Sequence, residues 1–223
     1  IDIKVLGDGK TGLLAENEGK NHLKGLADVE VTSALTGTSV PSTAVSASDG
    51  GMNTLIGTGA TTLKVVGRYA EGMVARSGVN GVATRNEVTS EGLLTVSVSG
   101  TSSTHALVAE STAGGVTENI LKADNILIES KGSYTGSGIK AVGSGASNTM
   151  QSNGGALNMS RDVNSTGGNM LGISYAGGGV NRIRGRDGKD DKVVMEGGGA
   201  SKELGAVIHR ARGGKGLENR VKE

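Results

Sequence analysis

The chain has 223 residues, a formal net charge of +1, 40 Gly, 1 Pro, 3 Tyr and no Phe, Trp or Cys. A core of ordinary thickness relies on aromatic side chains, which bury roughly 150–250 Å² each. The composition therefore argues against doubly wound α/β folds, TIM barrels and ordinary helical bundles. The lack of cysteine excludes disulfides, Cys-ligated zinc and thiol nucleophiles.

No apolar run approaches the roughly 18 residues of a membrane span, and no charged-then-apolar signal segment opens the chain. We therefore predict no membrane insertion and no signal peptide. The first residue is Ile1 and not Met, so we expect a fragment or a processed product.

Short strand-like runs recur along the chain, whereas a helical period is nearly absent. Examples are residues 28–31, 63–66, 93–98 and 125–129, several of which alternate apolar and polar residues between Gly, Ser or Thr clusters. These runs predict an all-β protein.

A short phrase also recurs: a small residue, a large apolar residue, any residue, and a second apolar residue, followed by polar residues and Gly. It begins at residues 12, 72, 92, 106, 138 and 156, so that the intervals are 60, 20, 14, 32 and 18 residues. Such intervals fit poorly with a single-chain solenoid, whose repeats stack at a nearly constant period.

Strands with one apolar face must bury it, and this chain offers little apolar surface against the backbone entropy of folding, roughly 1–2 kcal/mol per residue. Three chains wound together could share one narrow core and pair their strand edges with one another. We therefore expect an elongated, fibrous homotrimer. A monomeric parallel β-helix adhesin is a further class, and it would require a regular repeat length.

The phrase resembles the triple-stranded β-helix of bacteriophage tail fibres and of streptococcal prophage hyaluronidases. Residues 105–115, 137–146 and 154–160 match it best, and the resemblance extends over about residues 70–216. It implies a shaft or receptor-binding segment of a tail fibre or tailspike on the virion tail, outside the cell. The implied partners are two further copies of the chain, host surface polysaccharide and other tail or fibre proteins.

The same reading divides the chain into three parts. Residues 1–60 form an N-terminal β segment of unclear role, residues 61–216 the shaft, and residues 217–223 a tail. Residues 39–42, which contain the single proline, are the expected joint in the first part.

Basic residues are concentrated near the C-terminus: residues 181–223 carry 11 Lys and Arg against 7 Asp and Glu. Arg182, Arg184 and Arg186 alternate, and alternate residues of a strand share one face. Three guanidinium groups there could bind a polyanion such as an acidic polysaccharide. The alternative is a solvated charged edge neutralised by nearby aspartates. Nucleic acid is not expected, because aromatic stacking platforms are missing.

The hyaluronidase branch of the resemblance implies a polysaccharide lyase as the alternative function. Those enzymes are similar to residues 154–159, followed by an Asp and then a Tyr. Asp162 and Tyr175 are the nearest counterparts here, although Ser160 holds the position of the Asp. A β-elimination on a uronic acid needs a base, an acid and cations, which Tyr175, Asp162 and Arg182 with Arg184 could supply. A turn aspartate and a surface tyrosine are the simpler interpretation.

No cofactor or metal site is predicted. His22, His105 and His209 each stand alone in the sequence, and the Gly-rich runs lack the pattern of a phosphate-binding loop. Met73, Met150 and Met159 lie near the repeated phrase, where core filling is their expected role.

Overall fold

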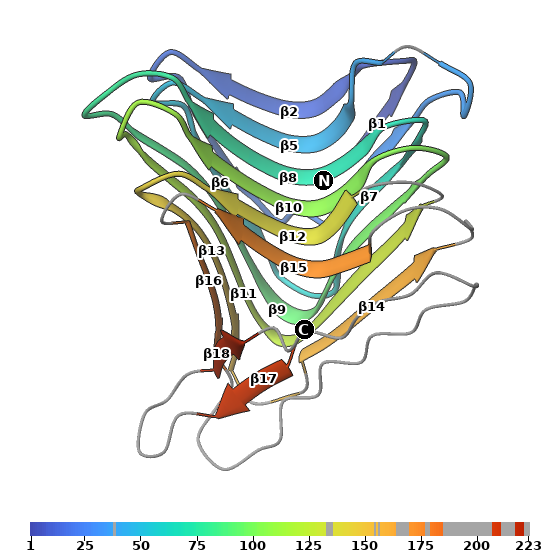
Figure 1. Ribbon diagram of the computed structural model, residues 1–223. Coiled ribbons are helices and arrows are strands. Elements are labelled where there is room, and N and C mark those ends of the chain that lie inside the picture. Colours follow the sequence, from blue (N-terminus) through green and yellow to red (C-terminus); the bar gives the residue numbers. More distant parts are fainter. Residues whose placement is uncertain are drawn as a thin grey trace.

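Short parallel strands stack throughout the computed structural model (Figure 1), and the part of the chain that it describes contains no helix. The structure describes residues 1–37, 39–132, 136–153, 155, 157–163, 170–176, 179–184, 207–210 and 217–220. The all-β prediction is confirmed. None of these residues belongs to a helix that is long and apolar enough to cross a membrane.

Each coil of the chain passes through three walls. The first wall is a six-stranded parallel sheet of β2 (Thr11–Glu16), β5 (Ser42–Ser48), β8 (Ala70–Ser77), β10 (Thr104–Ser111), β12 (Gly136–Val142) and β15 (Met170–Ala176). Its strands curve so that the outer face of the wall is concave (Figure 1).

The second and third walls belong to one larger sheet, because β9 (Ala83–Gly100) and β11 (Val116–Gly132) run through both. The second wall contains β3 (Lys20–Lys24), β6 (Met52–Gly57), the first halves of β9 and β11, β13 (Ala146–Ser152) and β16 (Val180–Arg184). The third wall contains β1 (Asp2–Leu6), β4 (Asp28–Thr32), β7 (Thr61–Gly67), the second halves of β9 and β11, and β14 (Leu157–Val163).

The coils repeat at a nearly constant length, so the interpretation that the intervals fit poorly with a single-chain solenoid was wrong. Register partners in the first wall lie 28 to 34 residues apart, along the column Leu13, Val45, Met73, Leu107, Ile139 and Ile173. The repeated phrase gave irregular intervals because its copies lie in strands of two different walls. The copies that begin at residues 92 and 156 supply Leu94 and Leu157 of the third wall, and the phrase was not recognised in the coils that contain Val45 and Ile173.

Strand pairing in the described residues is completed within one chain, and so is the core. Partners on other chains are therefore not needed to explain the strand pairing, contrary to the expectation from the sequence. Parallel columns of Val, Leu, Ile and Met fill the interior, with Val29, Leu63, Val96, Ile128 and Met159 in the third wall, all at most 1% exposed. The predicted narrow core without aromatic side chains is confirmed for these residues. Met73 and Met150 are buried in it as expected.

Gly or Ala precedes each member of the first-wall column, at residues 12, 44, 72, 106, 138 and 172. Close backbone approach explains the small side chains. A Cβ added at Gly72 would lie 2.5 Å from the carbonyl oxygen of Ala106 in the next coil and 2.6 Å from Cγ1 of Val96. The small residue of the repeated phrase thus marks the place where the wall bends inward.

The N-terminal part of the chain continues the same stack. The predicted boundary after residue 60 falls in the corner between β6 and β7, and the strands before it pair with those after it. In the predicted tail, β18 (Leu217–Arg220) pairs antiparallel with β17 (Val207–Arg210) and with β16.

A ladder of six asparagines runs through the second wall at one register position: Asn21, Asn53, Asn86, Asn119, Asn148 and Asn181. The Nδ2 of each of the first five donates to the Oδ1 of the next asparagine over 2.8–3.0 Å. The same Nδ2 atoms donate to carbonyl oxygens of the first wall over 2.6–2.8 Å, from Leu14, Ser46, Val74, Val108 and Lys140. The ladder therefore ties each corner of the stack to the coil that follows it.

We predict that Asn86→Ala lowers the free energy of unfolding by about 3 kcal/mol, because it leaves buried groups of Asn53, Asn119 and Val74 without their partners. Chemical denaturation followed by circular dichroism measures this change. The matched control is Asn158→Ala at an exposed position of β14, which should change the free energy by about 0.5 kcal/mol or less. Equal effects of the two variants would contradict a stabilising role of the ladder.

Candidate functional site

The residues predicted for a lyase lie on three different walls. Asp162 is in β14 of the third wall, Tyr175 in β15 of the first, and Arg182 and Arg184 in β16 of the second. The structure describes only the backbone of Asp162, Tyr175 and Arg184, and Arg186 lies outside the described residues.

The structure shows the exposure of Arg182 and the register position of Tyr175. Arg182 is exposed while the next residue, Ile183, is 1% exposed, which agrees with the predicted alternation along this strand. Tyr175 takes the register position that alanines hold in the preceding coils, at residues 15, 47, 75, 109 and 141.

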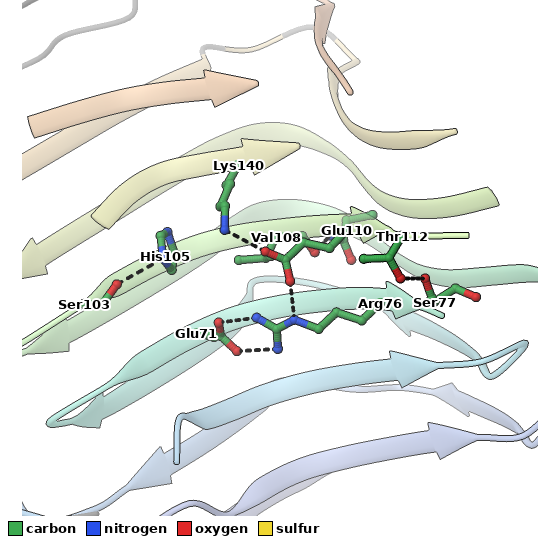
Figure 2. A network of polar contacts seen from close by, with 10 residues as sticks. Glu71, Arg76, Ser77, Ser103, His105, Val108, Glu110, Thr112 and Lys140 are labelled. Atoms are coloured by element: carbon green, nitrogen blue, oxygen red, sulfur yellow. Dashed lines mark hydrogen bonds and ion pairs between the residues drawn. The ribbon is translucent and has the colours of Figure 1, made fainter. Parts of the chain in front are cut away.

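A different cluster of polar side chains lies on the concave outer face of the first wall (Figure 2). Its centre is Arg76 of β8, whose Nη1 and Nη2 donate to the two carboxylate oxygens of Glu71 over 3.0 and 2.6 Å. These two residues are five positions apart on one strand. Residues five apart on a regular strand would face opposite sides, but the register with β10 is interrupted at Gly72, and Ala70 and Met73 both face the core, so that Glu71 and Arg76 meet on the outer face.

The cluster continues across neighbouring strands. Arg76 Nε donates to Glu110 Oε2 of β10 over 2.7 Å, and Lys140 Nζ of β12 donates to Glu110 Oε1 over 2.6 Å. We call Glu71, Arg76, Glu110 and Lys140 the ion network. It contains two anions and two cations, and it joins three consecutive coils across their outer face.

Outward-facing residues of the wall beside the ion network are buried as well. Val74 alternates with the inward-facing Met73 and Ala75, yet it is only 1% exposed, and Glu71 itself is 4% exposed. The Arg76 side chain keeps 43% of its surface exposed. The network thus combines a buried carboxylate with a guanidinium group that still reaches solvent.

Neighbouring groups stabilise the ionised forms of Glu110 and Arg76. Burial by itself would raise the pKa of Glu110, but hydrogen bonds from Lys140 and Arg76 and the charges of both outweigh burial, so the pKa is lowered. Burial likewise opposes the charge of Arg76, and its hydrogen bonds and ion pairs with Glu71 and Glu110 outweigh that effect and raise its pKa. Glu110 is therefore a hydrogen-bond acceptor and is poorly suited to donate a proton as a general acid.

Hydroxyl and imidazole groups border the network. Ser103 Oγ lies 3.1 Å from Nε2 of His105, and Thr112 donates through Oγ1 to the carbonyl oxygen of Ser77 over 3.3 Å (Figure 2). His105 is the register partner of Glu71. The concave wall therefore presents cations, carboxylates and hydroxyls on strands that cross the direction of stacking.

Inspection of the sequence did not single out the ion network or the asparagine ladder. A signal for the ladder was present, since Asn53, Asn86 and Asn119 are spaced by 33 residues. The ion network had no such signal, because Glu71 meets Arg76 through the bend of one strand. In the described part of the chain, no group of three or more His, Cys, Asp or Glu side chains could hold a metal ion.

Comparisons of the chain with protein-family models, with curated proteins and with solved structures gave no match.

We predict that Arg76→Gln lowers the free energy of unfolding by about 3 kcal/mol, because it leaves the buried Glu71 carboxylate without its cation. Lys64→Gln is the control. Lys64 and Glu30 form an ion pair whose side chains are 48% and 32% exposed, so neither partner is buried as Glu71 is. It should lower the free energy of unfolding far less than Arg76→Gln does, because exposed ion pairs contribute little to stability. A similar loss for both variants in urea titrations would contradict the role assigned to the ion network.

We also predict that stability falls in acid. Glu110 and Glu87 have lowered pKa values in the folded protein; at Glu87, hydrogen bonds and charges from Lys122 and Arg85 outweigh the effect of burial. Their stabilising contribution is complete above the unfolded pKa of about 4.3 and is lost as the pH falls through the folded values. Unfolding measured from neutral pH into acid should show this loss, with a shallower pH dependence in a Glu87→Gln, Glu110→Gln double variant. An unchanged pH dependence in the double variant would assign the acid sensitivity to other groups.

Proposed function

We propose that the chain is a structural and receptor-contacting segment of a phage tail fibre or tailspike, located on the virion tail and acting as a homotrimer. The observation that carries the proposal is the uninterrupted stack of coils, held in register by the asparagine ladder. Such a stack transmits force along its length and repeats the same surface from coil to coil, which suits a rod that positions a binding surface.

Host surface polysaccharide is the proposed ligand of the concave first wall. A linear polymer lying along the stack would meet equivalent register positions in successive coils. Across the wall it would also meet the exposed part of Arg76, Lys140 and the hydroxyls of Ser103 and Thr112, which lie at different register positions. Cations and hydroxyls are suitable partners for the carboxylates and hydroxyls of an acidic glycan. Arg182 on the second wall, with Arg184 and Arg186, forms the second proposed contact for polyanions.

The proposed trimer is an assembly of complete stacks. In a fully interlocked triple-stranded β-helix, pairs between chains would have to replace the pairs that one chain already makes. Stacks that lie side by side keep those pairs and can use outward apolar side chains, such as Leu14, Leu93 and Val116, which are 42–46% exposed.

Light scattering of the purified protein tests the assembly. A trimer gives about three times the chain mass of 22.2 kDa, and a single-chain mass would refute it. A single-chain mass would support the second candidate, a monomeric parallel β-helix adhesin, which the regular coil length favours.

Binding to a panel of acidic and neutral polysaccharides tests the receptor role separately. Lys140→Gln should weaken binding to acidic polymers if the concave wall is the contact surface, and Arg182→Gln should do so if the second wall is. Undiminished binding by both variants would contradict both proposed surfaces.

The lyase alternative has an independent test. If the protein cleaves a uronic-acid polymer by β-elimination, unsaturated products accumulate and absorb in the ultraviolet, and Tyr175→Phe abolishes the signal. A lack of products from every uronic-acid polymer tested would remove this alternative.

A further inference from the structure

An Asn-Gly pair lies at the corner where residues 78–82 lead from the first wall into the second. Asn80 and Gly81 are both exposed. Gly81 has a φ of 77°, and a Cβ added to it would meet nothing within 4 Å. Among the described residues, neither the Asn80 amide nor the Gly81 N–H takes part in a hydrogen bond.

The ladder asparagines have the opposite surroundings. Asn53, Asn86 and Asn119 are at most 1% exposed, and each Nδ2 donates two hydrogen bonds while each Oδ1 accepts one. The residue after each of them lies within a strand. The chain therefore contains protected asparagines and an unprotected Asn-Gly pair a few residues away.

We propose that Asn80 is a site of spontaneous covalent modification, at which the chain deamidates through a cyclic imide. The backbone nitrogen of Gly81 attacks Cγ of Asn80, and a C–N bond forms as the Nδ2 group leaves as ammonia and takes up the proton from the Gly81 nitrogen. Water then opens the ring at either carbonyl and gives aspartate or isoaspartate. Glycine favours the ring closure because no side chain crowds the attacking nitrogen.

The modification adds a negative charge at the rim of the concave wall and, in the isoaspartate form, one methylene to the backbone. The Asn80 side chain lies beside Gly114 of the next coil, since its Oδ1 would be 3.5 Å from a Cβ there. The corner can accommodate the extra methylene of isoaspartate. The number of residues between the first-wall carbonyl and the ladder asparagine that it binds already differs from coil to coil, from 7 to 12. This inference does not rest on the proposed function.

The test is to incubate the folded full chain at mildly alkaline pH and physiological temperature, and to follow each asparagine by peptide mass spectrometry with fragmentation that separates aspartate from isoaspartate. We expect both products at Asn80. Conversion at Asn53, Asn86 and Asn119 should be roughly tenfold slower or more, because it first requires local opening of the ladder. Asn80→Gln should remove the early products at position 80, whatever happens at the second Asn-Gly pair of the sequence, Asn153-Gly154, and leave the circular dichroism unchanged.

A synthetic peptide covering residues 76–84 provides the reference rate. If the peptide converts while Asn80 in the folded chain keeps its amide, the corner holds the Gly81 nitrogen away from the side chain and the inference is wrong. Conversion at the ladder asparagines as fast as at Asn80 would also overturn it.

Discussion

The amide ladder of the second wall is the constraint on which the rest of the stack depends. Register partners in the first wall lie 28 to 34 residues apart, so no single repeated turn fixes the register, and a shift by one residue would turn every side chain to the other face. Each ladder asparagine has two N–H donors and one oxygen acceptor, and all are satisfied only when an asparagine of the next coil lies directly beside it. The five bonds from Asn21 to Asn181 therefore select one register for the whole stack.

With the register fixed, a chain without Phe or Trp can still form a dry interior. Aliphatic residues and methionine repeat down each column, as in Val29, Leu63, Val96, Ile128 and Met159, so that the walls approach closely without aromatic side chains between them. The small residues before the first-wall column permit that approach, as the contact between Gly72 and the Ala106 carbonyl shows. On the outside of the first wall, Glu71 and Arg76 form an ion pair on the strand that also carries the buried Val74.

Composition and strand patterning were enough to predict an all-β protein with a thin core, and the repeated phrase did mark a real structural position. The single-chain nature of the stack was missed because two walls carry similar phrases, so that copies at residues 92 and 156 interrupted the true spacing. Regular spacing was visible in Asn53, Asn86 and Asn119, which are polar and were not considered as part of a core repeat. The site on the concave wall depends on a break of the strand alternation at Gly72, which the sequence pattern does not reveal.

Disulfide trapping tests the central claim, a single chain that pairs with itself, most directly. The chain has no cysteine, and Lys64 and Ser97 are register partners on the outside of neighbouring coils, at a separation that a disulfide can span. Oxidation of a Lys64→Cys, Ser97→Cys double variant should give a cross-link within one chain, which migrates as a monomer under non-reducing denaturing conditions. A Lys64→Cys, Glu129→Cys pair, which lies two coils apart, should not close. Cross-linking of the Lys64–Ser97 pair between chains would show that strands of different molecules interlock, and it would contradict the account.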